Sequence, residues 1–353
     1  MKDSNLIVVY GSYGYTGSLI VNLCKEKKLN VLLAGRNAEA LTRQSKESGF
    51  AVEVVESNDS ENLIRILKPA KLVIHCGGPF KHTAKFMSEA CLATSTHYTD
   101  ITGEYQVFES LAALDVQAKS AGIMVMPGTG FDVVPSDCLA AHLKRQLPDA
   151  THLQLAFATS SAGTSRGTKK TSVEGLGYPS LIRENGELID VPLGSRVVNI
   201  DFGPFRMNAL NIPWGDIATA WRSTRIPNIE VYMGANESMI RNAKMSNYIG
   251  WLLRQSWVKN YMMKKIDQRP PGPSQKKREG GRSFLWGKVW NSAGTIKISR
   301  LDTLSGYSLT AETAVLIAEK ILKDNLKPGY QTPSMAYGAD LIMEITGTNR
   351  VNL

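Results

Sequence analysis

A glycine loop between a strand-like run and a helix-like run constrains this chain more than any other feature. Residues 6–10 (LIVVY) form a short apolar run rich in β-branched residues, which is typical of a buried parallel strand. The loop 11–17 (GSYGYTG) follows directly, and residues 17–27 then carry apolar side chains at helical spacing. A glycine-rich turn from a strand into a helix is the arrangement that holds the diphosphate of a dinucleotide. The opening of the chain therefore predicts a dinucleotide-binding βαβ unit.

Each glycine of the loop has a predicted role. Gly11 would let the backbone turn sharply, Gly14 would leave room for the diphosphate, and Gly17 would let the helix pack closely on the strand. The free N–H groups at the start of the helix would bind phosphate. The cofactor site is assigned to this loop and to two later turns, which are Gly11, Ser12, Tyr13, Gly14, Tyr15, Thr16, Gly17, Arg36, Asn37, Cys76, Gly77, Gly78 and Pro79.

The residue after the second predicted strand favours NADPH over NADH. NAD-binding folds place an Asp or Glu at this point to accept a hydrogen bond from the ribose 2′-hydroxyl. This chain reads Ala34-Gly35-Arg36-Asn37 and offers no carboxylate there. The guanidinium of Arg36 suits a 2′-phosphate, so the predicted cofactor is NADP.

Alternating strand and helix patterns predict a doubly wound parallel sheet over residues 1–135. The helices are expected at 38–48, at 59–67 with Ser60 as the cap, at 82–92 and, as one helix, at 105–120. From 136 to 330 longer alternating segments predict an α+β domain on a mainly antiparallel sheet. A helix over 309–323 with Thr310 as a cap and a last helix over 332–345 complete the prediction.

The bulk composition excludes several classes. No segment reaches the roughly 18 uninterrupted apolar residues of a membrane span, and the N-terminal apolar run is too short for a signal peptide, so we expect a cytoplasmic protein. The scattered cysteines and histidines predict neither a disulfide nor a metal site. The net charge of +9 suits anionic ligands or an anionic membrane surface, or only solubility. No nucleic-acid-binding motif accompanies that charge.

Residues 245–266 combine four Trp and Tyr side chains with Arg and Lys and contain no acidic residue. Residues 245–255 keep one apolar face, and that phase is lost after Ser256. An aromatic, basic helix of this kind could lie at a membrane surface, or it could form a core or a dimer interface. The segment 267–282 that follows is rich in proline, glycine and basic residues, which predicts a surface loop.

Five motifs in this order identify a family resemblance: GSYGYTG (11–17), AGR (34–36), CGGPF (76–80), YTDITGE (98–104) and GFDVVPSD (130–137). They resemble the saccharopine dehydrogenase-like oxidoreductases. The branch is the one that contains the trans-acting enoyl reductases of mycobacterial lipid synthesis and the animal lipid-droplet proteins. FLWG (284–287), SGYSLT (305–310) and Thr332-Pro333 extend the resemblance over nearly the whole chain.

The resemblance implies an N-terminal NADP-binding Rossmann domain, a second α+β domain and a C-terminal helix, within 331–353, that returns to the first domain. It implies that Gly77, Gly78 and Pro79 lie beside the nicotinamide. It also implies that Asp100, Gly103, Asp132 and Ser136 line the junction between the domains. Tyr98, Asp100, Asp132 and Ser136 are the candidates for the catalytic acid or its relay, although Tyr98 could only pack and Asp132 could only cap a helix.

The leading hypothesis is an NADPH-dependent reductase that acts on an apolar, lipid-like, unsaturated substrate and forms a homodimer. A saccharopine dehydrogenase-type C–N oxidoreductase is an alternative, and it would use Arg166, Lys169 and Lys170 to bind substrate carboxylates. A non-catalytic NADPH-binding protein at a membrane is a second alternative, because the sequence shows no clear acid–base pair.

Overall fold

The computed structural model describes residues 5–160 and 163–353. The chain divides into two compact units. The first unit runs up to Val134 and includes Tyr307–Ala336, and the second unit comprises Pro135–Gly306 and Tyr337–Leu353. Residues 307–330, which the sequence pattern assigned to the second domain, lie in the first unit.

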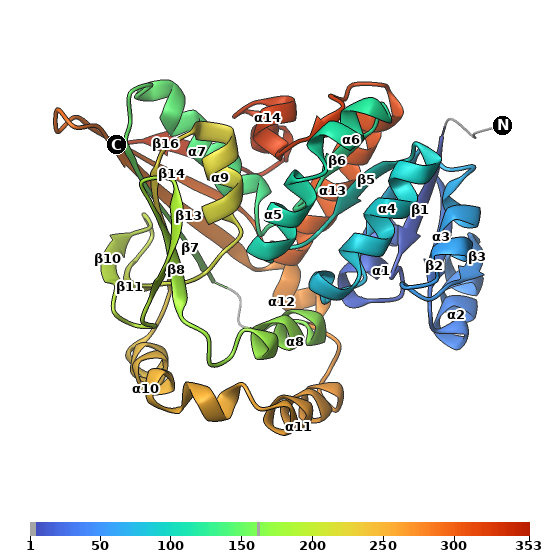
Figure 1. The fold of residues 1–353 in the computed structure, drawn as a ribbon, viewed down its shortest axis with the longest axis horizontal. Helices are drawn as coiled ribbons and strands as arrows, with labels where there is room; N and C mark the ends of the chain where they lie inside the picture. Colours follow the sequence, from blue (N-terminus) through green and yellow to red (C-terminus); the bar gives the residue numbers. More distant parts are fainter. Residues whose placement is uncertain (1–4, 161–162) are drawn as a thin grey trace. The chain divides into compact units, whose positions relative to one another are not determined.

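The first unit contains a parallel sheet of seven strands in the order β15-β6-β5-β4-β1-β2-β3 (Figure 1). All neighbouring strands in it are parallel. Because β1 lies between β2 and β4, the winding of the sheet reverses beside β1, and ligands of such sheets bind at the carboxyl ends of the strands around this point. The strands are β1 Leu6–Tyr10, β2 Asn30–Gly35, β3 Ala51–Val54, β4 Leu72–His75, β5 His97–Asp100, β6 Met124–Met126 and β15 Gly329–Tyr330.

Helices α3 to α6 cover one face of this sheet and share a core with Val8, Val73 and Val125 of its strands. Asp59, not Ser60, caps α3, because its carboxylate accepts from the Asn62 backbone N–H. The predicted helix over 105–120 is two helices, α5 and α6. The helices of the first unit are α1 Tyr15–Glu26, α2 Ala38–Ser48, α3 Ser60–Leu67, α4 Ala84–Thr94, α5 Tyr105–Ala112, α6 Asp115–Ser120 and α13 Gly306–Leu322.

Helix α13 brings a distant stretch of sequence back to the first sheet. Thr310 is not its cap but lies in its second turn, where the hydroxyl accepts from the Phe131 N–H at 3.0 Å. Lys27 pairs with Glu319 at 2.7 Å, and β15 then joins the sheet beside β6. The start of α13 thus lies against the turn that follows β6.

The second unit is built on a mainly antiparallel sheet in the order β10-β11-β12-β7-β13-β14-β16, in which only the β12–β7 pair is parallel. A β8–β9 hairpin joins it at β12. Helix α7 packs on the sheet so closely that a β-carbon at Gly287 would lie 2.6 Å from Leu143 Cδ1. The strands are β7 His152–Thr159, β8 Ser180–Glu184, β9 Glu187–Val191, β10 Val197–Asp201, β11 Arg206–Asn211, β12 Asn228–Gly234, β13 Arg282–Trp290, β14 Ile296–Leu304 and β16 Asn349–Asn352. The helices are α7 Val134–Gln146, α8 Arg166–Glu174, α9 Asp216–Thr224, α10 Glu237–Leu253, α11 Ser256–Asp267 and α12 Gln275–Glu279.

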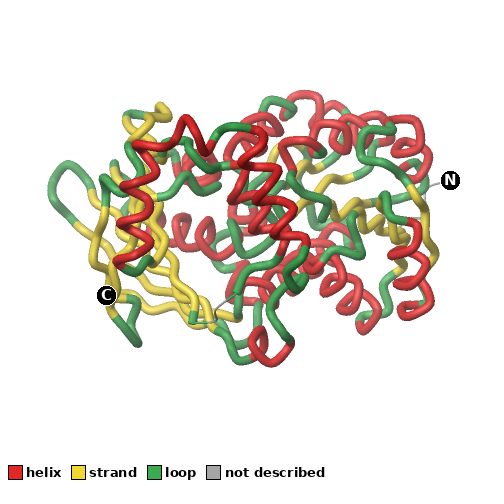
Figure 2. The backbone as a smooth tube through the Cα atoms, turned by 90° about the horizontal axis from the view of Figure 1, so that it is seen from below, coloured by secondary structure: helices red, strands yellow, loops and turns green. Residues whose placement is uncertain are grey.

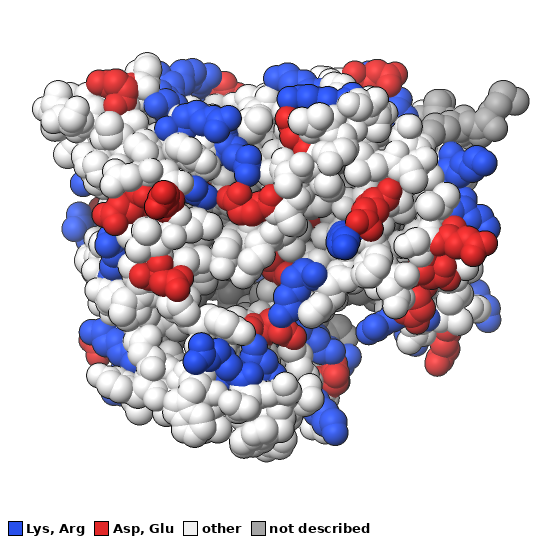
Figure 3. Space-filling view, viewed as in Figure 1, with Lys and Arg blue, Asp and Glu red and all other residues white. Residues whose placement is uncertain are grey.

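Residues 245–266 fall on α10 and α11, which face the viewer in Figure 2. The loss of helical phase predicted near Ser256 is the break between these two helices. The interpretation of this segment as a core helix is wrong, because Gly250 and Ile266 are the only buried residues that the structure describes in the two helices. The surface over them, at the bottom of Figure 3, is mostly uncharged with basic side chains beside it. Within the described part of the chain, no helix has the length and apolarity needed to cross a membrane.

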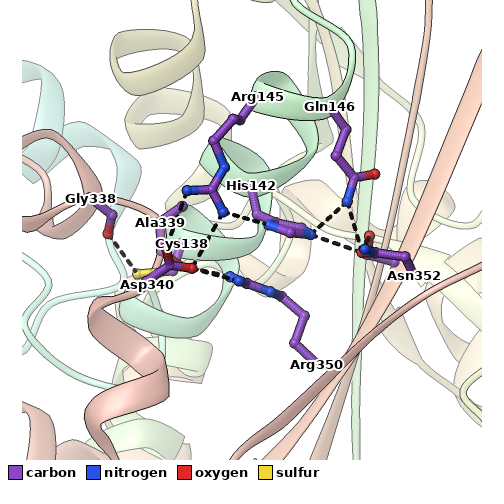
Figure 4. A network of polar contacts seen from close by, with 10 residues as sticks. Cys138, His142, Arg145, Gln146, Gly338, Ala339, Asp340, Arg350 and Asn352 are labelled. Atoms are coloured by element: carbon purple, nitrogen blue, oxygen red, sulfur yellow. Dashed lines mark hydrogen bonds and ion pairs between the residues drawn. The ribbon is translucent and has the colours of Figure 1, made fainter.

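The predicted helix over 332–345 is wrong. A short helix, α14 (Pro333–Tyr337), stops at Gly338 with φ +85°, and the chain continues through a 3-10 turn at Leu341–Glu344 into β16. Arg350 in β16 pairs with Asp340 at 2.5 Å, and Asn352 accepts from His142 of α7 at 2.8 Å (Figure 4). The last residues therefore belong to the second unit, and the predicted return of 331–353 to the first unit ends at residue 336.

Candidate functional site

The glycine loop after β1 is packed backbone against backbone. Gly11 has φ +75°, and a β-carbon there would lie 2.8 Å from the Gly77 nitrogen of the turn after β4. A β-carbon at Gly17 would lie 2.5 Å from the Gly11 carbonyl oxygen. Only glycine fits at either position. The two turns that flank the reversal point of the sheet can therefore pack this closely only because these positions carry no side chain.

The start of α1 is shaped to receive an anion. Among the residues that the structure describes, no side chain caps this helix, whose N-cap is Gly14. A β-carbon at Gly14 would meet only the Gly11 carbonyl oxygen, at 3.2 Å, so its other side is open. The first backbone N–H groups of a helix and the positive end of its dipole favour a diphosphate at such a point. Ser12, by contrast, is fully buried, and its carbonyl oxygen accepts from Gln44 Nε2 at 2.9 Å.

The end of β2 presents a cation to solvent. Arg36 is exposed and forms no ion pair with any residue that the structure describes. Asn37 is engaged locally, because its side-chain oxygen accepts from the Ala40 N–H and so caps α2. The ring of Tyr13 lies against Gly35, where a β-carbon would be 2.7 Å from Cε1. Arg36 is thus the side chain at this turn that is available to a 2′-phosphate.

Glu104 holds the turn after β4. Its carboxylate oxygens accept from the backbone N–H groups of Phe80 at 2.8 Å and Lys81 at 2.9 Å. These two charge-assisted hydrogen bonds join the segment after β5 to the turn Cys76–Pro79. The sequence reasoning did not single out Glu104 for this role, because the contact spans 23 residues and leaves no local pattern.

His75, at the end of β4, forms hydrogen bonds that hold the same turn. The single hydroxyl proton of Thr83 goes to the Gly77 carbonyl oxygen at 2.8 Å, so His75 Nε2 must donate to Thr83 Oγ1, also at 2.8 Å. His75 Nδ1 is then the acceptor for the Gly77 N–H at 3.4 Å. Burial lowers the pKa of His75 to about 3, which keeps this tautomer neutral.

Tyr98 and Asp100, two of the catalytic candidates, are fully buried and face each other. The Tyr98 hydroxyl donates to Asp100 Oδ2 at 2.6 Å, while Asp100 Oδ1 accepts from the N–H groups of Thr102 and Gly128. Burial raises the pKa of Asp100 to about 6, although its hydrogen bonds act in the opposite direction. This carboxyl joins the turns after β5 and β6, which is a positioning role.

Asp132, the third candidate, lies half-buried beside the turn after β5. A β-carbon at Gly103 would be 2.5 Å from Asp132 Oδ2, so the carboxyl lies directly against the Gly103 backbone. Burial, and secondarily the negative charge of Glu104, raise the pKa of Asp132 to about 7. Such a carboxyl exists in both protonation states at neutral pH, as a general acid requires.

Ser136, the fourth candidate, belongs to the second unit. Its hydroxyl donates to Asp216 Oδ1 of α9 at 2.6 Å, and both side chains are buried. The sequence reasoning did not include Asp216. The other candidate segments lie together in the first unit, at the carboxyl ends of β1, β2, β4, β5 and β6.

A further residue near the glycine loop comes from far along the sequence. The ring of Tyr307, at the start of α13, lies edge-on against Tyr15 with ring centroids 5.0 Å apart. The SGYSLT motif marked this stretch as part of the family pattern, but no sequence signal placed it beside the glycine loop.

Comparison with known proteins matches residues 7–126 to the saccharopine dehydrogenase NADP-binding domain. The chain is 26% identical over 203 residues to the saccharopine dehydrogenase-like oxidoreductase of Mus musculus, which covers 50% of this chain and 47% of that protein. It is 29% identical over 189 residues to the lipid droplet localized protein of Caenorhabditis elegans, with coverage of 48% and 44%. It is 29% identical over 149 residues to the trans-acting enoyl reductase of Mycobacterium leprae, with coverage of 40% and 36%. The matches span about half the length, or less, of these relatives.

A solved structure matches the whole fold. The apo histidine-tagged saccharopine dehydrogenase (L-Glu forming) from Saccharomyces cerevisiae superposes with a TM-score of 0.71, covering 99% of this chain and 100% of that chain at 12% identity. At this identity the likeness shows the fold alone. With the parallel sheet and the family match, it confirms the predicted Rossmann domain and second mixed-sheet domain, and NADP as the cofactor of the first. Residues 7–126 match the saccharopine dehydrogenase NADP-binding domain, and the chain is similar to the saccharopine dehydrogenase-like oxidoreductases.

Proposed function

We propose that this oxidoreductase reduces an apolar, lipid-like, unsaturated substrate of the enoyl type with NADPH. The observation that carries the proposal is the position of the Asp132 carboxyl, in the turn after β6, which lies against the Gly103 backbone at the sheet edge that carries the glycine loop. Burial raises the pKa of this carboxyl to about 7, which suits proton donation. Bound NADPH supplies a hydride, and the reduction of an enoyl group then needs one proton on the adjacent carbon.

The proposed cofactor site uses the turns at the carboxyl ends of the strands. The uncapped N-terminus of α1 would bind the diphosphate, with Gly11, Gly14 and Gly17 keeping the backbone close. Arg36 would pair with the 2′-phosphate. The nicotinamide half would lie along Cys76–Pro79, whose backbone Glu104 and His75 hold in place. The remaining assigned residues would contribute to the shape of this cofactor site; they are Ser12, Tyr13, Tyr15, Thr16 and Asn37.

Asp132 is the proposed proton donor because the other candidates are enclosed. Tyr98, Asp100 and Ser136 are buried. Asp132 keeps part of its surface in contact with solvent. The protonated carboxyl would deliver its proton to the substrate carbon and recover one from water.

The substrate class is proposed from the relatives. One is named a trans-acting enoyl reductase and another a lipid droplet localized protein. The saccharopine-type alternative receives less support, because two of its three basic side chains are engaged within the second unit. Arg166 Nε donates to the Arg269 carbonyl oxygen, and Lys170 pairs with Asp267 at 2.6 Å. A homodimer, a cytoplasmic location and peripheral membrane contact through 245–266 remain predictions.

NADPH consumption in the presence of enoyl thioesters of increasing acyl length tests the proposal. We expect saturable oxidation of NADPH, slower by about 100-fold in Asp132→Asn, with NADPH affinity unchanged in that variant. Saccharopine and imine mixtures form the comparison arm. If NADPH binds tightly but no enoyl substrate consumes it, the reductase proposal fails, and a non-catalytic NADPH-binding protein becomes the better description.

A further inference from the structure

The apolar side of α10 and α11 points to solvent. Met245, Tyr248 and Ile249 recur at the helical spacing that normally faces a protein core, yet Tyr248 is 84% exposed. Trp251 and Trp257 are 63% and 67% exposed. We name this set the aromatic face, and its members are Met245, Tyr248, Ile249, Trp251, Trp257 and Tyr261.

The opposite side of the two helices is fixed to the rest of the second unit. Lys259 Nζ donates to the Glu174 carbonyl oxygen at 2.7 Å, and Asn247 bonds the backbone of Leu193 in both directions. Gly250 lies against Gly177, where a β-carbon at either position would be 3.0 Å or less from the facing carbonyl oxygen. The helices cannot rotate without breaking these contacts, so the aromatic face is held outward.

The charged side chains within residues 238–266 are all basic. Between residues 238 and 266 the chain contains no Asp or Glu, while its basic residues are Arg241, Lys244, Arg254, Lys259, Lys264 and Lys265. All of these except Lys259 are exposed, and Lys265 lies over the Tyr261 ring at 4.6 Å. A partner for this surface must therefore accept aromatic rings and carry negative charge.

The aromatic face continues into a groove. The groove has a volume of about 480 Å³ and lies between α10 and the neighbouring strands β10 and β11. Met245 and Tyr248 form part of its wall together with Val197 and Ile240, and Glu237 is the one carboxylate among its lining residues. The groove has the size of a pocket for a small apolar group, which gives a partner a concave point of entry.

A second copy of this chain does not suit the aromatic face. A two-fold interface would place the same patch on both partners, so the five exposed basic residues would face five others across a desolvated surface. An anionic lipid surface carries the complementary charge and accepts Trp and Tyr rings at the level of its headgroups. We propose that the aromatic face docks this protein on an anionic lipid bilayer, independently of its reductase activity.

Docking would use both kinds of side chain. The Trp and Tyr rings would enter the headgroup region, while the aliphatic stems of Lys264 and Lys265 would lie along the interface with their ammonium groups near the lipid phosphates. Each basic residue near such a surface strengthens binding about fivefold, and salt screens this part of the interaction.

Co-sedimentation with phosphatidylcholine vesicles, with and without phosphatidylserine, tests the proposal on the full chain. We expect binding to the phosphatidylserine vesicles that weakens as salt rises. Trp251→Ser with Trp257→Ser should weaken it about tenfold or more, and Lys264→Gln with Lys265→Gln about 25-fold. The matched control is Ile296→Ser with Lys297→Gln on β14, which removes one exposed apolar and one basic side chain elsewhere and should bind as the parent does.

Two outcomes would overturn the proposal. One is equal partitioning of the parent and both aromatic-face variants. The other is a dimer by light scattering that dissociates in Trp251→Ser with Trp257→Ser while vesicle binding is absent. NADPH affinity, measured in solution, should be the same in all variants and shows that they are folded. A failure here leaves the enoyl assay unaffected, so the two proposals fail separately.

Discussion

The Asp132 carboxyl lies against the α-carbon of Gly103, so that a β-carbon at position 103 would fall 2.5 Å from Oδ2. The two residues belong to different turns, one after β5 and one after β6. The position of the proposed proton donor is therefore set by the absence of a side chain on a neighbouring turn.

Gly103→Ala should lower kcat by one to two orders of magnitude, because the new methyl group displaces the carboxyl by an ångström or more. NADPH affinity should change little, since Gly103 is not among the residues proposed to contact the cofactor. Enoyl turnover and fluorescence titration with NADPH measure the two quantities. Gly167→Ala, in the exposed helix α8, is the matched control and should keep kcat. A normal kcat in Gly103→Ala would argue against Asp132 as the donor.

The pH dependence follows from the raised pKa of Asp132. The protonated form donates the proton, so kcat should fall as pH rises through about 7. Stability has the same sign: the folded state holds the proton more tightly than the unfolded chain, so stability is fully present below the unfolded pKa near 4 and declines as pH rises to 7. Asp132→Asn should therefore be more stable than the parent at pH 8, by on the order of 1–2 kcal/mol. Thermal unfolding at pH 5 and pH 8, with the parent as reference, checks this sign.

Cofactor choice should depend on Arg36. Arg36→Ala removes the exposed guanidinium proposed to pair with the 2′-phosphate, at a cost of about 1.5–3 kcal/mol, or roughly 10- to 100-fold in NADPH affinity. NADH affinity should hardly change because NADH lacks that phosphate. Titration of both cofactors against both proteins gives the ratio. Lys46→Ala, another exposed cation of the first unit, serves as the control for general loss of positive charge. An equal loss for both cofactors would contradict the assignment.

The sequence predicted the features of the first unit that arise from neighbouring residues. The glycine loop, the strand runs and the turns at 76–80, 98–104 and 130–137 each carry a local pattern, and a parallel sheet necessarily brings the ends of its strands to one edge. Two contacts were not predictable from the sequence, because they form between segments that are distant along the chain. They are the hydrogen bond from the Phe80 N–H to Glu104 and the packing of Tyr307 on Tyr15. Reliance on local sequence patterns also explains two wrong predictions. Helical spacing over 332–345 did not reveal that Gly338 would end the helix, and an apolar helix face at 245–255 did not reveal that solvent would cover it.

Glu104 links the cofactor turn to the proposed acid, which makes Glu104→Gln the sharpest test of the site. The Gln side chain can still accept from one of the two N–H groups of Phe80 and Lys81, but without its charge, so NADPH affinity should fall several-fold. Glu104 also raises the pKa of Asp132 through its negative charge. Its neutralisation should move the midpoint of the kcat–pH profile to lower pH by roughly 0.5–1, while burial keeps that midpoint above the ordinary range of a carboxyl.

The two effects of Glu104→Gln can be separated by measurement. NADPH titration at one pH reports the hold on the turn after β4, and the kcat–pH profile at saturating NADPH reports the charge on Asp132. Glu109→Gln, on the following helix α5, is the control for loss of one carboxylate nearby and should leave the profile in place. A purely structural role for Glu104 would lower affinity or stability without moving the midpoint. If Glu104→Gln shifts the midpoint of the kcat–pH profile while Asp132 is present, and the titration is missing from Asp132→Asn, the titrating group is Asp132. The midpoint would then move because the charge of Glu104 acts on the Asp132 carboxyl.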